Sequence, residues 1–308
     1  MPPAINRMMT PAEWGLLITL ALLWGGSYFY IAIAIKVLPA LTIVAFRVVL
    51  GAVLLYLAVR ATGAAMPRDG ASWRAYFVMG FLNNVVPFSL IAWAQSHVAS
   101  GLAAILNATT PLFAVVFAHY LTGDERMTAG RVVGVVIGFA GVVVMIGPDA
   151  LGGMNTDLMA ELALLLASVF YAVSPIYARR FSRAGHAPIV SATGQFAAAA
   201  VMMVPLAFFI DKPWTLPMPG LGVWAALIAL ATLSSAVAYI MYYQLLKTAG
   251  AVNLLLVTFL VPVSAILLGA VFLHERLALA DFAGMGLIAL GLAAIDGRPL
   301  RLLRLARA

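Results

Sequence analysis

Ten stretches of apolar residues, each long enough to cross a lipid bilayer as a helix, divide this sequence and restrict what it can fold into. They cover approximately residues 13–35, 40–59, 74–95, 99–121, 130–147, 158–178, 188–210, 221–246, 250–273 and 279–296. A helix of about 20 residues spans the hydrocarbon core of a bilayer, which is about 30 Å thick. Hydrophobic residues make up 64% of the chain and charged residues 9%, a balance that a soluble domain could not bury. The sequence predicts an all-α membrane protein with ten transmembrane helices.

The net charge is +7, and the basic residues are distributed unevenly between the two ends of these spans. With the amino terminus inside, fourteen Lys and Arg residues face the cytoplasm, and only Lys36, Lys212 and Arg276 face outward. The positive-inside rule favours this orientation, with both termini cytoplasmic in the plasma membrane. In the last segment, residues 298–308, arginines alternate with leucines, which favours a basic tail on anionic lipid. The charge therefore fits topology and lipid contact, and we expect no nucleic-acid partner.

An internal repeat relates the two halves of the chain, because residues 109–141 align with residues 260–291. The matched positions are Pro111 and Pro262, Glu125-Arg126 and Glu275-Arg276, Gly134 and Gly284, and Gly141 and Gly291. Each half holds five spans, an odd number, so the halves are expected to be inverted repeats. The predicted domains are residues 1–150, residues 151–297 and the basic tail at 298–308. We expect the Glu-Arg pairs to cap helix ends.

Inverted repeats of this kind can exchange conformations and alternate access to a site near the middle of the membrane. Pro111 and Pro262 occupy equivalent positions in the two repeats. Proline bends a helix because it lacks a backbone N–H donor. We therefore expect these two prolines to act as hinges of opposing gates.

The repeated motif, together with Trp24-Gly25-Gly26-Ser27 in the first span and Phe46-Arg47 in the second, resembles the drug/metabolite transporter superfamily, EamA type. The resemblance covers essentially the whole chain and implies a basket of ten helices, in which the first four helices of each half enclose a cavity. Within the superfamily the chain is most similar to bacterial aromatic amino-acid exporters of the YddG type. The second half departs from the pattern, with Phe170-Tyr171-Ala172 at its start and Gln195 near the counterpart of Arg47.

The candidate binding residues are polar and aromatic side chains in the middle of the spans. Asn83 and Asn84 are adjacent and cannot share one helix face, so one of them is expected to face the cavity. Arg47 either holds a substrate carboxylate or, as arginines near a bilayer edge often do, extends to the interface or pairs with an acid. Aromatic faces suit a flat apolar substrate with a polar head, and an aromatic amino acid is the leading hypothesis. The expected substrate-binding residues are Asn83, Asn84, Trp93, Tyr28, Tyr171, Tyr239, Tyr243 and Arg47.

The acidic residues bear on the transport mechanism, since all eleven lie at or near span ends. A proton-coupled antiporter usually needs a buried carboxylate, so facilitated diffusion or exchange is favoured. Proton-coupled efflux of drugs or metabolites remains the alternative, through Glu13, Glu161 or His119.

The sequence lacks the motifs that are typical of several enzyme classes and metal sites. The chain has no cysteine, no paired-histidine zinc motif and no aspartate-rich loop, so no catalytic residue, metal or cofactor is expected. A membrane-embedded enzyme and a non-catalytic membrane assembly protein are the remaining alternatives. The sequence favours a secondary transporter that exports small amphipathic metabolites, contacts the lipid bilayer, and exists as a monomer or weak dimer.

Overall fold

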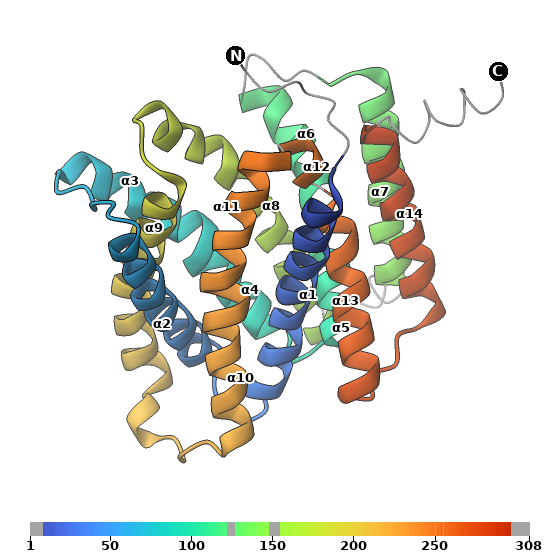
Figure 1. Ribbon diagram of the computed structural model, residues 1–308. Helices are drawn as coiled ribbons and strands as arrows, with labels where there is room; N and C mark the ends of the chain where they lie inside the picture. The colour runs from blue at the N-terminus through green and yellow to red at the C-terminus, as the bar shows by residue number, and fades with distance from the viewer. Residues whose placement is uncertain (1–8, 122–126, 148–154, 250, 255, 297–308) are drawn as a thin grey trace.

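The computed structural model describes residues 9–121, 127–147, 155–249, 251–254 and 256–296. All regular secondary structure in these residues is helical, and the helical spans run up and down the molecule in alternation (Figure 1). Some spans consist of consecutive segments, such as α3 and α4. The upper end of Figure 1 is where α1, α3 and α9 begin, and the lower end is where α2, α5 and α10 begin. The α-helices are α1 Pro11–Ala34, α2 Ala40–Ala61, α3 Gly70–Gly80, α4 Val86–Ala94, α5 Ser100–Asn107, α6 Thr110–Leu121, α7 Ala129–Ile146, α8 Thr156–Arg183, α9 Pro188–Leu206, α10 Leu221–Ala231, α11 Ala238–Ala249, α12 Ala251–Leu254, α13 Val257–Phe272 and α14 Leu279–Asp296.

Eight helical stretches in the described residues are long and apolar enough to cross a membrane. They coincide with the first eight expected spans, from Pro11–Ala34 to Leu221–Leu245. The ninth and tenth expected spans contain the shorter apolar helices Val257–Phe272 and Leu279–Ile295. Ten complete crossings therefore stay a prediction. The same holds for the roles expected of Glu125-Arg126 and of residues 298–308, which lie outside the described residues.

Several spans are interrupted near their middle, and the interruptions have local causes. Between α3 and α4 the chain forms a π-helical segment, η1 (Phe81–Val85), in which the Val86 amide donates to the Phe81 carbonyl. Pro87, which follows, has no N–H to donate to the carbonyl of Asn83, so the regular ladder cannot continue there. A second π-helical segment, η5 (Thr232–Val237), separates α10 from α11. The break between α5 and α6 is stabilised by the Thr109 and Thr110 hydroxyls, which donate to the Leu106 and Asn107 carbonyls.

Two carboxylates at the lower end satisfy backbone amides of other helices. Asp211 lies at the end of η3 (Ala207–Asp211), which extends α9, and it accepts from the Thr42 backbone amide at 2.7 Å and from the Thr42 hydroxyl at 2.8 Å. Glu275, after α13, accepts from the Ser100 amide at 3.0 Å and the Ser100 hydroxyl at 2.8 Å. Each carboxylate thus caps a helix N-terminus that is far away in the sequence, where a negative charge is favourable.

Helix pairs that join the two halves of the chain form most of the packing. α7 lies against α14 at one side of the molecule, and α2 packs on α9, α1 on α13, and α4 on α8 (Figure 1). Glycines permit the close approach of α7 and α14: a Cβ atom on Gly134 would lie 2.5 Å from the Gly291 carbonyl oxygen, and one on Gly141 would lie 2.6 Å from that of Gly284. Small residues let membrane helices pack closely in this way.

The α7–α14 contact provides a test of the fold. Replacing Gly141 with valine should destabilise the protein by about 1–3 kcal/mol, because the added side chain collides with the backbone of α14. Gly130 lies on the same helix, where a Cβ atom would meet nothing within 4 Å, so Gly130→Val is the matched control. Thermal unfolding in detergent measures both variants, and equal melting temperatures would contradict the packing described for α7 and α14.

Candidate functional site

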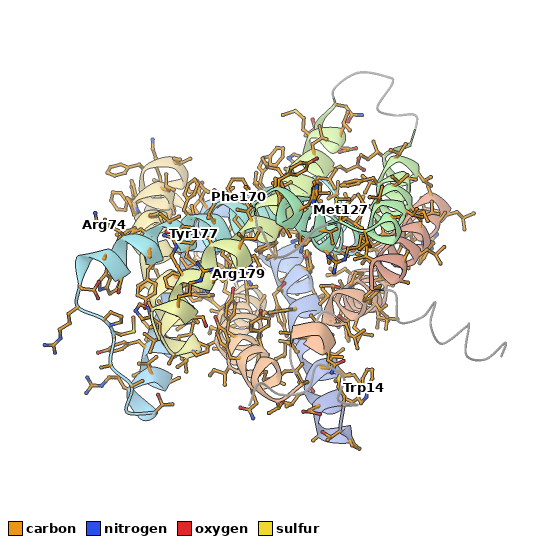
Figure 2. The ribbon with its side chains drawn as sticks, turned by 90° about the horizontal axis from the view of Figure 1, so that it is seen from above. Trp14, Arg74, Met127, Phe170, Tyr177 and Arg179 are labelled. Carbon is orange, nitrogen blue, oxygen red and sulfur yellow. The ribbon has the colours of Figure 1, made fainter. Side chains whose placement is uncertain are left out.

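A cavity of about 1010 Å³ lies between the helices, and its lining extends to the end of α8 and the α8–α9 connection. Its deep part is lined by residues near the middle of the spans, among them Tyr28 of α1 and Arg47 of α2. Its outer part is lined by Arg179 and Ser182 at the end of α8 and by His186 in the α8–α9 connection. Figure 2 shows this end of the molecule, with Arg179 and Tyr177 on α8 and Arg74 on the neighbouring α3.

Arg47 is the charged residue in the deep part of the cavity, and its side chain is 6% exposed. Its Nε donates to the Ser235 hydroxyl at 3.0 Å, and its guanidinium carbon lies 3.7 Å from the centre of the Phe88 ring. The phenol groups of Tyr28, Tyr171 and Tyr239 are close enough to interact with it electrostatically. These neighbours are all neutral. Arg47 makes no ion pair with a described residue.

Asn83, Tyr239 and Gln195 form a polar group across the cavity from three different helical segments. The Asn83 amide donates to the Tyr239 hydroxyl at 3.0 Å and to the Gln195 side-chain oxygen at 3.4 Å. All three residues line the cavity. Because the Tyr239 hydroxyl accepts from Asn83, its own proton is oriented for another acceptor.

Aromatic rings form one wall of the cavity, mostly on α11. Tyr243 lies 5.1 Å from Tyr242 and 6.3 Å from Tyr239, measured between ring centres. Trp24 of α1 contacts Tyr242 at 5.6 Å, and Tyr239 also packs edge-on against Phe196. Such a wall offers both apolar faces and hydroxyl groups to a ligand.

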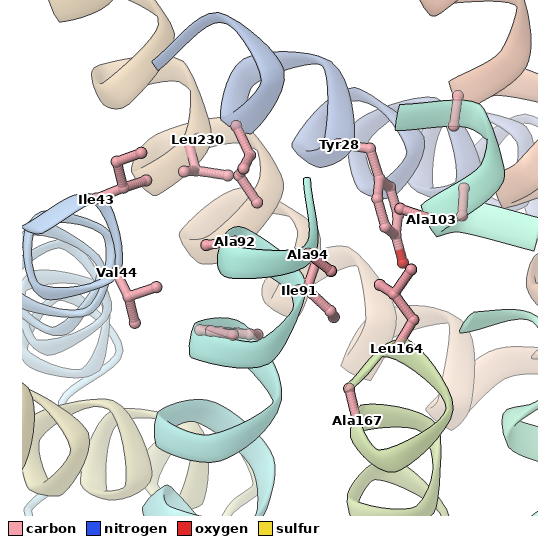
Figure 3. Packing of buried hydrophobic residues seen from close by; sticks show 14 of the residues in the cluster. Tyr28, Ile43, Val44, Ile91, Ala92, Ala94, Ala103, Leu164, Ala167 and Leu230 are labelled. Carbon is pink, nitrogen blue, oxygen red and sulfur yellow. The ribbon is translucent and has the colours of Figure 1, made fainter. Parts of the chain in front are cut away.

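The floor of the cavity is a well-packed core at the lower end. Tyr28 points from α1 toward Ala103 of α5 and Leu164 of α8 (Figure 3). Ala94, Ala103 and Leu164 are fully buried. The lining of the cavity therefore runs from this packed core, beside Tyr28, to Arg179 and His186 at the upper end.

The structure brings six of the expected binding residues to this cavity: Tyr28, Arg47, Asn83, Tyr171, Tyr239 and Tyr243. Asn84 does not line it. Its side chain is fully buried, and its amide atoms have no hydrogen-bond partner among the described residues, although the Tyr239 hydroxyl is near enough for a weak interaction. Trp93 lines a second pocket of about 700 Å³ near the lower end, together with Lys36 and Asp211.

The two expected hinge prolines occupy related places. Pro262 lies inside α13 and lines the cavity, and Pro111 is the second residue of α6, next to the cavity-lining Thr110. Proline at these positions provides no helical N–H donor to the carbonyls of Thr258 and Asn107. The Asn107 carbonyl instead accepts from the Thr110 hydroxyl at 2.8 Å.

Sequence reasoning did not select His186 or Arg179 as site residues. His186 Nδ1 lies 2.9 Å from the Tyr76 hydroxyl and its Nε2 lies 3.5 Å from the Ser72 hydroxyl. The Ser72 hydroxyl donates to Asp69, and hydrogen bonds from the Ser72 amide and hydroxyl lower the pKa of Asp69. Arg179 belongs to a basic helix end that the sequence explains by topology alone. No sequence signal marks either side chain as facing the cavity.

The ionisable groups in the cavity, apart from tyrosines, are Arg47, Arg179 and His186, and no acidic side chain lines it in the described part of the chain. No group of three His, Asp or Glu residues in that part could hold a metal ion. Cationic side chains therefore lie at both ends of the cavity, Arg47 in its deep part and Arg179 in its outer part.

Comparison with known proteins gives consistent matches over most of the chain. The model of the family described as "EamA-like transporter family" matches residues 13–147 and again residues 158–295. An uncharacterized transporter of Bacillus subtilis, YoaV, is 23% identical over 90% of this chain and 94% of its own. The uncharacterized inner membrane transporter YedA of Escherichia coli K12 is 25% identical over 92% of this chain and 89% of its own.

Two further matches extend this comparison. Protein PecM of Dickeya dadantii is 26% identical over 85% of this chain and 84% of its own. A crystal structure described only as that of a protein superposes with a TM-score of 0.67 at 22% identity, covering 96% of this chain and 99% of that chain. The structural match shows that the two chains share a fold.

Asn84 provides a test of the site geometry. Replacing it with leucine should leave stability unchanged or raise it by about 1–3 kcal/mol, because two buried polar atoms without partners are removed. Asn83→Leu is the matched control and should destabilise the protein, since it leaves the Gln195 oxygen without its donor. Thermal unfolding in detergent compares the variants, and a loss of stability in Asn84→Leu would show that Asn84 has a partner in the folded protein.

Proposed function

The chain belongs to the EamA-like transporter family, and we propose that it exports small amphipathic carboxylates across the plasma membrane by alternating access. Its apolar helices and its inner-membrane relative make it a multi-pass plasma-membrane protein. The family and the relatives are transporters, which points away from an enzyme. The observation that carries the substrate class is the deep cavity in which Arg47, which forms no ion pair with a described residue, lies beside an aromatic wall.

Two inverted five-helix repeats, residues 1–150 and 151–297, would provide the alternating motion. Several observations support this duplication. The family model matches each half separately. The third and eighth expected spans each contain a π-helical segment, η1 and η5. Arg47 and Gln195 are each the eighth residue of their helices, α2 and α9.

The orientation follows from charge. The basic residues Arg60, Arg68, Arg74, Arg180 and Arg183 belong to segments at the upper end, where the cavity opens, whereas Lys36, Lys212 and Arg276 belong to the lower end. The positive-inside rule then places the upper end, where α1 begins and α14 ends, in the cytoplasm. In that orientation the cavity is open to the cytoplasm and closed to the outside, a state ready to load a substrate for export.

The substrate is proposed from the lining of the cavity. The rings of Trp24, Tyr239 and Tyr243 suit a flat apolar body, and Arg47 suits a carboxylate. Aromatic amino acids belong to this class. Because no acidic side chain of the described residues lines the cavity, we propose facilitated diffusion or exchange rather than proton coupling through a carboxylate.

Counterflow in proteoliposomes tests the proposed function. Vesicles are preloaded with unlabelled tryptophan or indole-3-lactate, and a trace of the same labelled compound is added outside without an ion gradient. We expect transient accumulation above that of protein-free vesicles for at least one compound. No accumulation of either would contradict the proposed substrate class.

The aromatic wall can be tested in the same assay. Tyr239→Ala should lower the initial counterflow rate by about tenfold or more, because it removes both a ring and a hydroxyl donor from the cavity. Tyr120→Ala is the control, since Tyr120 is an exposed aromatic residue outside the cavity lining. Equal rates in the two variants would remove Tyr239 from the site.

At the lower end Glu275 caps α5, and we expect this contact to keep the cavity closed toward the outside of the cell. Glu275→Gln weakens a cap worth about 1 kcal/mol, so we expect about fivefold more outward opening. The chain has no cysteine, so Ser27→Cys places a single label in the cavity. Labelling of intact cells by an impermeant maleimide should become faster in Glu275→Gln and stay unchanged in the control Arg276→Gln. Equal labelling in both would show that the cap does not control opening.

A further inference from the structure

We propose that the transported compounds carry a net negative charge, so that the site prefers aromatic hydroxy or keto carboxylates to the zwitterionic amino acids. This inference rests on the proposed function and narrows its substrate class. It follows from how the charges of the cavity are placed. The inference predicts different binding for two compounds that differ only in the α-substituent, a neutral oxygen group in one and an ammonium group in the other.

The first step is the charge state of Arg47. Its guanidinium is buried and contacts a serine hydroxyl and a phenylalanine ring, and phenol groups interact with it electrostatically. A hydroxyl and a ring face stabilise a cation without neutralising it. A buried charge without a counter-ion is costly, and an anion that enters the cavity supplies the missing partner.

The second step is the balance of charge with a bound substrate. A zwitterion brings one carboxylate and one ammonium group, so the site around Arg47 keeps a net charge of about +1. The ammonium group would place a second positive charge in the same cavity as Arg47, and the described lining residues include no Asp or Glu to balance it. A carboxylate with a neutral α-substituent leaves the site electrically neutral. In a low-dielectric cavity this difference favours the anion.

The third step is the set of hydrogen-bond donors around Arg47. The Tyr239 hydroxyl accepts from Asn83, and its proton is therefore oriented for an acceptor on the substrate. Tyr171 presents a second phenol close to the same guanidinium. Donors converging beside a cation fit the oxygen atoms of a carboxylate with an α-hydroxyl or keto group. A carboxylate can accept from these hydroxyl groups, whereas an ammonium group can only donate to their oxygen atoms.

The fourth step is the mouth of the cavity. Arg179 and His186 line the outer part, and Arg180 and Arg183 lie on the same helix end. A positive entrance raises the local concentration of anions and disfavours cations. The deep site and the entrance therefore select the same charge.

The test compares three ligands that share the indole ring: indole-3-lactate, an anion; tryptophan, a zwitterion; and tryptamine, a cation. Calorimetric titration uses the full-length protein in lipid nanodiscs. We expect indole-3-lactate to bind at least about tenfold more tightly than tryptophan, and tryptamine to show no binding. The counterflow rates of the two carboxylates should follow the same order.

Variants at Arg47 identify the source of the preference. Arg47→Gln should remove the difference between indole-3-lactate and tryptophan, and Arg47→Lys, which keeps the charge, should preserve it. Arg60→Gln removes a positive charge from the exposed end of the same helix and should leave the preference intact. Size-exclusion profiles and thermal unfolding report whether each variant is folded.

The possible outcomes separate this inference from the proposed function. Tryptophan binding as tightly as indole-3-lactate, or more tightly, would overturn the inference and leave the proposed transporter of amphipathic carboxylates in place. A preference for the anion that survives in folded Arg47→Gln would also overturn it, because the selectivity would not come from this residue. Failure of all three ligands to bind, with no counterflow, would overturn the inference and the proposed function together.

Discussion

The constraint on which this structure depends is that the bilayer core offers no water to the backbone. Every N–H and C=O group at that depth has to find a partner within the protein. Continuous helices satisfy this requirement, and they make up most of the described chain. Where a span is interrupted, the freed groups need other partners or a wet cavity. The interruptions at η1, at η5 and between α5 and α6 all occur in spans that line the cavity. The need of freed backbone groups for partners or water therefore links the positions of the helix breaks to the position of the site.

The burial of Arg47 shows how such a site accommodates a charge without forming a conventional ion pair. Burying a cation in a low-dielectric region is costly, and a fixed carboxylate nearby would reduce the cost. It would also compete with any anionic ligand. The chain instead surrounds the guanidinium with neutral groups that hold it in place, among them Ser235 and Phe88. Burying Arg47 among neutral groups lowers the stability of the folded protein, but it leaves the charge able to bind an anionic ligand. Ionisable groups within membranes typically occupy functional sites.

Much of the fold could be predicted because the length of a continuous apolar stretch is enough to identify a membrane span. The predicted spans 13–35 and 40–59 correspond to Pro11–Ala34 and Ala40–Ala61 within two residues. Side-chain direction was harder to predict, since membrane helices are apolar on most faces and show no clear periodicity. Asn83 and Asn84 illustrate the limit: the sequence indicates that adjacent amides point differently, but only the packing of η1 decides that Asn83 lines the cavity. Glu275 was expected to cap a helix end, and it caps α5, a partner that only the tertiary fold provides.

The two proposed repeats differ at an equivalent position in the cavity, where the first has Arg47 and the second has Gln195. In two inverted repeats that exchange conformations, backbone movements are symmetric, but a side chain present in one repeat only stays with that repeat. In the proposed repeats Gln195 stands where an arginine equivalent to Arg47 would be, and it already accepts from Asn83. A single cation on one side of the pseudo-symmetry axis can orient a carboxylate in one direction, whereas two would bind a dianion or repel each other. The asymmetry therefore fits a ligand with one charged head and one apolar body, which keeps its head on α2 while the opening moves from one side of the membrane to the other.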